Sequence, residues 1–272
     1  MIFTLMFPGF DPTLVQIGPL AIRWYALAYI GSLVLGWRIV RRLDQLSPMV
    51  CTPEQTDDFL TWATLGVVLG GRLGYVLFYQ PAHYLTHPLE AFAVWQGGMS
   101  FHGGALGVIV ALFLYSRRHG LSFRGFADRV CVIVPLGLGL GRIANFINGE
   151  LPGRIAPDWL PWGMVGFPGT GPEPRHPSQL YQAGLEGLIS LLIMLFLCSK
   201  PGIRARFGTL SGAFLVCYGV ARIIGEFFRQ PDPFLGFLFA GATMGQLLSL
   251  PMVIAGLVLI ATAKPARATV PA

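Results

Sequence analysis

Seven apolar stretches, separated by short polar segments, dominate the sequence. A helix that crosses the hydrocarbon core of a bilayer needs about 20 mostly apolar residues, because each residue advances the helix by about 1.5 Å. Each stretch is close to that length. The sequence therefore predicts an all-α polytopic membrane protein with about seven transmembrane helices. The stretches cover roughly residues 19–40, 58–79, 99–116, 127–148, 178–198, 209–228 and 241–262.

The composition supports the membrane assignment. Of the 272 residues, 54% are hydrophobic and only 12% are charged, which is far more apolar than an ordinary soluble domain. The net charge of +6 would suit nucleic acid only if the basic residues gathered on one soluble face. They are scattered through short loops instead. We therefore expect a lipid bilayer as the surroundings and no nucleic-acid partner.

Basic residues in the loops predict the orientation of the chain. Cytoplasmic loops of membrane proteins are enriched in Lys and Arg, and an odd number of helices puts the termini on opposite sides. We expect a periplasmic N-terminus and a cytoplasmic C-terminus. The cytoplasmic loops then hold Arg41, Arg42, Arg117, Arg118, Arg124, Lys200, Arg204, Arg206, Lys264 and Arg267, and the periplasmic loops hold Arg154, Arg175 and Arg229.

The longest periplasmic connection, about residues 149–177, is rich in Pro, Gly and Trp. Pro and Gly disfavour long helices, and Trp suits the membrane interface. We expect a small periplasmic cap within a single transmembrane domain of residues 1–272. The other long periplasmic connection, about residues 80–98, mixes apolar and polar residues, which indicates a short amphipathic piece along the membrane surface.

Two histidines of this second connection, His83 and His87, have a spacing that metal sites use. Pro88 disfavours such a site, and we expect no nearby acidic or thiol partner. The sequence therefore predicts neither a metal ion nor a cofactor.

Three arginines interrupt the apolar stretches at one predicted depth. Arg72 lies in GGRLGY, Arg142 in LGRIAN and Arg222 in GVARIIGEF, each about five to seven residues before its helix is expected to end. That spacing places them roughly 8–10 Å below the outer interface. Charged side chains inside a membrane segment are costly and are functional candidates by default. Other polar residues predicted at this level are Arg23, Tyr25, Ser100, His102, Asn145, Asn148, Glu150 and Glu226.

The charge balance at this level favours an anionic ligand. Within the membrane we expect only Glu150 and Glu226 as acidic partners, against four arginines when Arg23 is counted. The planar fork of arginine suits a phosphate diester, so the pattern indicates a phospholipid headgroup in the outer leaflet. The alternative is that each arginine reaches the interface or pairs with an acid to hold the helices together, as Glu226 could do for Arg222.

Glycines flank His102 on both sides, at positions 97, 98, 103 and 104. This pattern suggests a segment that admits a substrate to a histidine. In membrane helices glycines also allow close packing of backbones, and a histidine can be a satisfied core residue, so both alternatives stay open.

The segment GRIANFINGELPG, residues 141–153, resembles the signature Gly-Arg-x-Gly-Asn-Phe-x-Asn-x-Glu-x-x-Gly of the bacterial phosphatidylglycerol–prolipoprotein diacylglyceryl transferase family. Ala144 stands where glycine is commoner. The resemblance extends over nearly the whole chain in the family's order. It includes the blocks FPGFDP, IRWYALAY, GGRLGYVLFY, GGMSFHGG, RHPSQLY, RIIGEFFRQPD and MGQLLSLPM.

The resemblance implies an activity in the bacterial inner membrane, with the active site facing the periplasmic leaflet. Such an enzyme moves the diacylglyceryl group of phosphatidylglycerol to the lipobox cysteine of a preprolipoprotein signal peptide. A thioether forms and glycerol 1-phosphate leaves, which is the first step of lipoprotein maturation. Both substrates would approach laterally between helices.

The resemblance also implies roles for individual residues. Arg142 and Arg222 would hold the phosphate and favour its departure. His102 would take the thiol proton or, if the arginines already lower the pKa of the thiol, only position lipid. The expected catalytic residues are His102, Arg142, Arg222 and Tyr25, and the expected substrate-binding residues are Arg142, Asn145, Asn148, Glu150, Gly153, Gly98, Gly103 and Glu226.

Two other classes of function compete with a transferase. A transporter would place its site near the midplane and show repeats in two halves, whereas here the charge lies in one leaflet. A structural lipid-binding protein would explain the arginines but not the glycines around His102. Without the resemblance, the residues indicate a phospholipid-handling membrane enzyme and no more.

Overall fold

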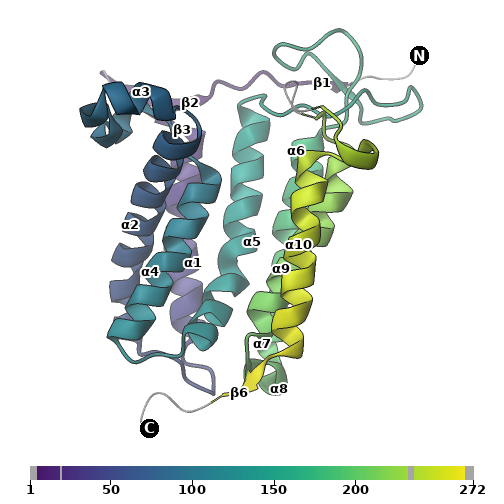
Figure 1. Cartoon of the computed structure of the whole chain (residues 1–272). Helices are drawn as coiled ribbons and strands as arrows, with labels where there is room; N and C mark the ends of the chain where they lie inside the picture. Colours follow the sequence, from purple (N-terminus) through teal and green to yellow (C-terminus); the bar gives the residue numbers. More distant parts are fainter. Residues whose placement is uncertain (1–4, 19, 232–235, 267–272) are drawn as a thin grey trace. The chain divides into compact units, whose positions relative to one another are not determined.

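Helices make up most of the chain in the computed structural model, which describes residues 5–18, 20–231 and 236–266 (Figure 1). Arg267 and the last residue of the block RIIGEFFRQPD lie outside these residues. Each of the seven predicted stretches contains a helix, which confirms the all-α membrane fold. The helices are α1 (Trp24–Leu43), α2 (Pro53–Phe78), α4 (Phe101–Arg118), α5 (Phe123–Ile147), the continuous run α6, η3 and α7 (Ser178–Gln182, Ala183–Ile189, Ser190–Ser199), α9 (Thr209–Glu226) and α10 (Met244–Ala261).

Five segments of the described chain are helical, long and apolar enough to cross a membrane. They are α2, α5, α9, α10 and the run from Ser178 to Ser199. Helices α1 and α4 lie in the other two predicted stretches, and each has two arginines in its last turn. The chain is therefore a multi-pass membrane protein, while the count of seven spans and the orientation stay predictions.

Helix α1 begins later than its apolar stretch. Residues Thr13–Ile17 form β2 and Leu20–Arg23 form β3, and the two strands pair antiparallel. Arg23 is thus a strand residue paired with Thr13, not part of the first helix. The apolar pattern of the stretch continues across the strand and the helix, so hydropathy alone does not mark the boundary.

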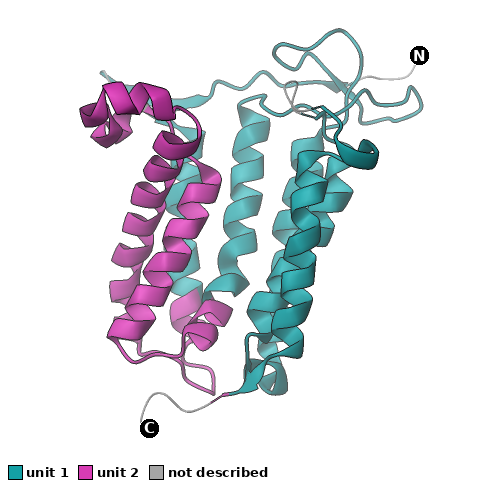
Figure 2. Cartoon of the chain, in the orientation of Figure 1, with its two compact units in different colours: residues 1–39, 130–265 teal, residues 40–129, 266–272 magenta. Residues whose placement is uncertain are grey.

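Contacts divide the chain into two compact units (Figure 2). Unit 2 comprises residues 40–129 and 266–272. Its helices α2 and α4 cross on glycines: a Cβ on Gly70 would lie 2.4 Å from the carbonyl oxygen of Gly103, and a Cβ on Gly103 would lie 2.3 Å from that of Gly70. Only glycine permits such an approach of two backbones. Packing between helices therefore explains Gly70 and Gly103.

The connection after α2 consists of short pieces, namely α3 (Pro81–Thr86) and two 3-10 turns, η1 (Pro88–Phe92) and η2 (Val94–Gln96). The sequence predicted one short amphipathic piece here, and its place along the membrane surface stays a prediction. At the other end of α2, Thr52 and Gln55 form a capping box, in which two side chains satisfy backbone N–H groups that the first helical turn leaves unpaired.

Unit 1 comprises residues 1–39 and 130–265. Its helices α9 and α10 pack along each other through Gly212 and Gly256, where a Cβ on Gly212 would lie 2.5 Å from the carbonyl oxygen of Gly256. Helix α8 (Pro201–Arg204) leads into β5 (Arg206–Phe207), which pairs antiparallel with β6 (Lys264–Pro265). The turn η4 (Phe239–Gly241) precedes α10.

The segment predicted as a cap, residues 149–177, contains no helix. Its strand β4 (Met164–Val165) pairs in parallel with β1 (Leu5–Met6), which ties the N-terminal segment to the cap. Phe7, Phe146 and Phe167 form a small buried aromatic core between them, with Phe7 stacked on Phe167 at 4.7 Å. The absence of helix predicted from Pro and Gly is confirmed.

Candidate functional site

A buried carboxylate, Glu186, lies between two arginines of unit 1. Arg142 donates from Nε and Nη2 to Glu186 Oε2 at 3.1 and 3.0 Å. Arg222 donates from Nη1 to the other oxygen, Oε1, at 3.4 Å. The Glu186 side chain is 0% exposed, whereas Arg142 and Arg222 are 16% and 13% exposed. One carboxylate therefore holds the guanidiniums of two helices.

Two glycines bring this carboxylate to Arg142. Gly139 of α5 and Gly187 of η3 lie backbone to backbone, such that a Cβ on Gly187 would be 2.5 Å from the Cα of Gly139. Arg142 follows Gly139 by almost one helical turn, and Glu186 precedes Gly187. The close crossing thus places the two side chains at the same level. Segment η3 is a π-helix, a widened turn that occurs often at functional sites.

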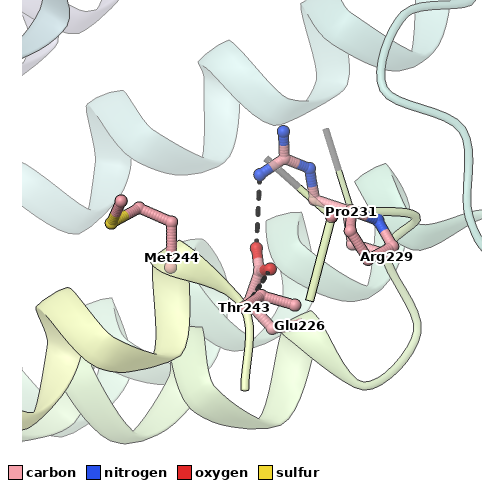
Figure 3. A pocket seen from close by; sticks show the side chains of 7 residues that line it. Glu226, Arg229, Pro231, Thr243 and Met244 are labelled. Carbon is pink, nitrogen blue, oxygen red and sulfur yellow. Dashed lines mark hydrogen bonds and ion pairs between the residues drawn. The ribbon is translucent and has the colours of Figure 1, made fainter. Parts of the chain in front are cut away.

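The ion-pair chain continues along α9. Arg222 Nη2 contacts Glu226 Oε1 at 2.7 Å, and Arg229 Nη1 donates to the same oxygen at 3.2 Å. Thr243 donates its hydroxyl to Glu226 Oε2 at 2.7 Å (Figure 3). Beside these residues is a pocket of about 20 Å³, roughly enough for one water molecule. The pairing of Arg222 with Glu226 four residues later is confirmed.

Glu186 corrects the charge balance inferred from the sequence. Glu150 and Glu226 were the only acidic partners expected within the membrane, but the acid shared by Arg142 and Arg222 is Glu186. The expectation that Glu150 and Glu226 are the only acidic partners was therefore wrong. A lone carboxylate in an apolar helix, AGLEGLIS, is itself the signal that was missed, because such a charge is rarely tolerated without a partner.

A second cluster forms where α5 ends. Tyr25 donates its hydroxyl to Glu150 Oε2 at 2.9 Å, and Asn145 Nδ2 donates to the same oxygen at 3.1 Å and to the Tyr25 hydroxyl. Asn148 Nδ2 donates to Glu150 Oε1 at 3.2 Å. The chain turns back here through left-handed backbone at Gly149 and Leu151, with φ of 67° and 55°. This turn points the carboxylate of Glu150 back over the helix end.

Gly153 lies at a close approach of backbones in the cap. A Cβ there would be 2.1 Å from the carbonyl oxygen of His176. Its own carbonyl oxygen accepts from Arg175 Nη1 at 3.0 Å, and the residue forms an isolated bridge with Arg229. The glycine is required by this packing, which secures the segment after the second cluster.

His102 belongs to unit 2, at the second residue of α4. Ser100 caps the helix by accepting from the N–H of Gly103 at 3.2 Å. The exposed His102 ring meets the Phe101 ring at 5.8 Å between centroids. A pocket of about 430 Å³ is lined by Phe78, Tyr79, Ser100, His102, Gly103 and Leu106. The histidine therefore lines an apolar pocket.

Arg72 ties the connection after α2 to the helix. The buried guanidinium donates to the carbonyl oxygens of Glu90, Ala91 and Gly97 at 2.6, 2.8 and 2.6 Å, and lies over the ring of Tyr84 at 5.3 Å. All three guanidinium nitrogens therefore donate hydrogen bonds to backbone carbonyl oxygens. The alternative that an arginine serves to hold the structure together therefore accounts for Arg72.

Gly98 belongs to the same arrangement. It adopts a φ of 72°, and a Cβ there would lie 2.6 Å from the ring of Tyr75 and 2.9 Å from Nη1 of Arg72.

His83 has an acidic neighbour, because its Nε2 lies 2.8 Å from Glu90 Oε2. The expectation that no acidic residue lies near this histidine was therefore wrong. Within the described ranges no group of three or more His, Cys, Asp and Glu residues could hold a metal ion.

Comparisons with known proteins identify the family. A family model described as prolipoprotein diacylglyceryl transferase matches residues 12–262. The chain belongs to the prolipoprotein diacylglyceryl transferase family.

Three full-length relatives carry the name phosphatidylglycerol–prolipoprotein diacylglyceryl transferase. The relative from Gluconacetobacter diazotrophicus is 65% identical to this chain, and the alignment covers 98% of this chain and 96% of the relative. The one from Paramagnetospirillum magneticum is 62% identical, with 97% of each chain covered. The one from Rhodospirillum rubrum is 54% identical and covers 98% of this chain and 97% of its own. The similarity therefore spans both units.

Within this diacylglyceryl transferase family member, the signature segment contributes to both clusters of unit 1. Arg142 joins the ion-pair chain, while Asn145, Asn148 and Glu150 form the cluster with Tyr25. An arginine pair that is partly exposed above a buried carboxylate can bind an anion and stabilise negative charge that develops on it. The second cluster offers amide and hydroxyl groups suited to a polar headgroup.

Proposed function

We propose that this chain transfers the diacylglyceryl group of phosphatidylglycerol to the thiol of the lipobox cysteine in a preprolipoprotein. The products are a thioether and glycerol 1-phosphate, and the reaction is the first step of bacterial lipoprotein maturation. Membership of the family and the names of the close relatives support the reaction. The observation that carries it is the pair Arg142 and Arg222, held together by one buried carboxylate.

The reaction is a displacement at the sn-3 carbon of the diacylglyceryl group. The cysteine sulfur forms a bond to this carbon while the bond from the carbon to the phosphate oxygen breaks. The thiol proton goes to a base, and the phosphate leaves with an additional negative charge. Stabilising that charge lowers the barrier, because it is larger in the transition state than in the bound lipid.

Arg142 and Arg222 bind this phosphate in the proposal. Both are cationic and partly exposed, while the carboxylate that holds them is fully buried. Charge-assisted hydrogen bonds from a guanidinium to phosphate are strong and directional. The same contacts become stronger as the phosphate leaves, so the pair serves both binding and catalysis. Glu226 orients Arg222 through its 2.7 Å contact.

His102 is proposed as the base that takes the thiol proton, which an imidazole can do near neutral pH. Its place in an apolar pocket is also compatible with positioning of lipid. Tyr25, Asn145, Asn148 and Glu150 would hold the glycerol headgroup through the hydroxyl, amide and carboxylate groups that they gather at the end of α5. Gly98, Gly103 and Gly153 complete the proposed binding residues by allowing the backbone approaches described above.

The location follows from the substrates. We place the protein in the bacterial inner membrane with its N-terminus in the periplasm and its C-terminus in the cytoplasm. The active site then faces the periplasmic leaflet, seven helices cross the membrane, and residues 1–272 with the cap at 149–177 form one transferase domain. Phosphatidylglycerol and the signal peptide reach it laterally through the bilayer, and the reaction needs no cofactor or metal.

The proposed reaction is tested with purified protein, phosphatidylglycerol and a lipobox peptide. We expect glycerol phosphate release and a peptide mass increased by one diacylglyceryl group, with neither product when the peptide cysteine is replaced by alanine. Lipid binding without either product from the cysteine peptide would contradict the proposal. His102→Gln separates the two roles of the histidine. If His102 is the base, the substitution should greatly lower kcat. If His102 positions lipid, the substitution should mainly raise KM.

A further inference from the structure

Glu186 contacts both arginines of the proposed phosphate site, yet it is shielded from any ligand. Resting on the proposed function, we propose that Glu186 is a positioning residue of the transfer. Its carboxylate fixes the separation and orientation of the Arg142 and Arg222 guanidiniums, so that both address one phosphate group.

The contacts of Glu186 divide between its two oxygens. Oε2 receives Nε and Nη2 of Arg142, and Oε1 receives Nη1 of Arg222. Two donors from one edge of the Arg142 guanidinium fix the plane of that group, which leaves its remaining nitrogen, Nη1, for a ligand. A carboxylate has two oxygens at a fixed separation. It therefore sets the distance between the two arginines as well as their orientation.

Burial separates the role of Glu186 from the role of the arginines. The carboxylate is 0% exposed, but both guanidiniums retain exposed surface. An anionic headgroup can therefore contact Arg142 and Arg222 from the exposed side, while Glu186 remains beneath them. The acid acts through the arginines and does not touch the substrate.

Electrostatics makes this support necessary. Two guanidiniums that converge on one site repel each other in a medium of low dielectric constant. A carboxylate between them offsets the repulsion without occupying their exposed sides. Arg222 has a second carboxylate, Glu226, at 2.7 Å, whereas Glu186 is the acid that contacts Arg142 in the described chain. The positive charge of Arg142 is thus less neutralised than that of Arg222, and Arg142 attracts phosphate more strongly.

The backbone around Glu186 is arranged for this position. The π-helical segment Ala183–Ile189 carries the carboxylate, and its Gly187 contacts Gly139 one turn before Arg142. Ser190 closes the widened turn by donating its hydroxyl to the carbonyl oxygen of Leu185 at 2.8 Å. The helix geometry and the charge contacts therefore place the same side chain.

The test compares Glu186→Gln, Glu186→Asp and Met194→Leu in the full-length protein. Glutamine keeps the size of the side chain and removes its charge. Aspartate keeps the negative charge, which still offsets the repulsion between the two arginines. Its shorter side chain does not bring the carboxylate as close to both guanidiniums. Met194→Leu is the matched control, because Met194 is fully buried in the same helical run and leucine keeps its apolar character and its approximate size. We measure kcat, KM for phosphatidylglycerol and the midpoint of thermal unfolding.

A positioning role predicts that Glu186→Gln lowers kcat at least tenfold and changes KM less than threefold. The two cations still bind phosphate, but they no longer align with the leaving group. Glu186→Asp should recover part of kcat, and Met194→Leu should stay within twofold of wild type. If Glu186→Gln does not yield folded protein, Glu186→Asp decides by the same criterion of lower kcat at an unchanged KM.

Two results overturn the inference while the proposed function stands. In the first, wild type is active and Glu186→Gln keeps its kcat. In the second, kcat falls only in proportion to the folded fraction, as it would for a merely structural residue. Inactive wild-type protein would instead contradict the proposed function, and the inference with it.

Discussion

Gly139 and Gly187 bring two backbones into contact beneath the arginine pair, and a Cβ on Gly187 would lie 2.5 Å from the Cα of Gly139. Arg142 and Glu186 extend from the two sides of this crossing and meet at 3.0 Å. A change of a single methyl group at the crossing should therefore displace an ion pair without removing either charge.

Gly187→Ala tests this relationship, with Gly184→Ala as its control. Both glycines lie in the π-helical segment, but a Cβ on Gly184 would meet no atom within 4 Å. We expect Gly187→Ala to lower kcat at least tenfold and reduce stability by about 1–3 kcal/mol, as overpacking does. Gly184→Ala should be close to wild type in both. Equal effects of the two changes in transferase assays and thermal unfolding would show that the crossing has no special role.

Arg222→Lys should fail even though it keeps the charge. Arg222 uses Nη1 for Glu186 and Nη2 for Glu226, and a single ammonium group lacks the fork that spans both carboxylates. We expect kcat to fall at least tenfold and the unfolding midpoint to drop. Arg118→Lys, at an exposed position in α4, should leave both unchanged. Full activity of Arg222→Lys would mean that charge alone suffices.

Arg72→Gln should loosen a connection and not weaken phosphate binding. Glutamine cannot supply the donors that Arg72 extends to Glu90, Ala91 and Gly97. Backbone amide exchange over residues 84–98 should therefore become faster, because the segment loses its tie to α2. KM for phosphatidylglycerol should change less than in Arg142→Ala. Unchanged exchange in this segment, measured by mass spectrometry, would refute the structural role of Arg72.

The stability of unit 2 should depend on pH through the carboxyl group of Asp44. Burial raises the pKa of its carboxyl to about 6, although the Thr56 hydroxyl, Cys51 and Arg129 act in the opposite direction. Because the folded state binds this proton more tightly than the unfolded chain, stability decreases as pH rises from about 4 to about 6 and then levels off. The contribution of Asp44 to the free energy of unfolding should be about 1 kcal/mol more favourable to the folded state at pH 5 than at pH 7.5.

Asp44→Asn should remove this dependence. An amide retains an acceptor for the Thr56 hydroxyl, which lies 2.7 Å from the carboxylate, and carries no buried charge. The difference in unfolding temperature between variant and wild type should therefore shift in favour of the variant as the pH rises from 5 to 7.5. Thermal unfolding at the two pH values measures this. A parallel pH dependence in variant and wild type would show that Asp44 does not titrate in this range.

Hydropathy was sufficient to predict the membrane fold. Each of the seven apolar stretches contains a helix, because the length and apolar character of a helix are local properties of the sequence. The start of α1 was misplaced because the pairing of Leu20–Arg23 with Thr13–Ile17 is a contact between segments. The cap at 149–177 was predicted from its Pro and Gly content, which acts locally on the backbone.

The polar partners were harder to predict. Spacing along one helix was enough to pair Arg222 with Glu226. The partner of Arg142 lies 44 residues away and depends on the crossing at Gly187, which only packing determines. Arg72 looked equivalent to Arg142 in the sequence, but the carbonyls around it come from a connection whose course depends on tertiary structure. Spacing along one helix therefore predicted a partner four residues away, whereas partners from other segments could not be predicted from the sequence.

The most direct measurement of the central claim is turnover by Arg142→Ala. The assay follows glycerol phosphate release from phosphatidylglycerol in the presence of a lipobox peptide, alongside wild type and Arg118→Ala. If Arg142 stabilises the departing phosphate, kcat/KM should fall by at least 100-fold, or about 3 kcal/mol, while the Arg118 variant stays within twofold of wild type. Release by folded Arg142→Ala at a rate near that of wild type would contradict the phosphate site.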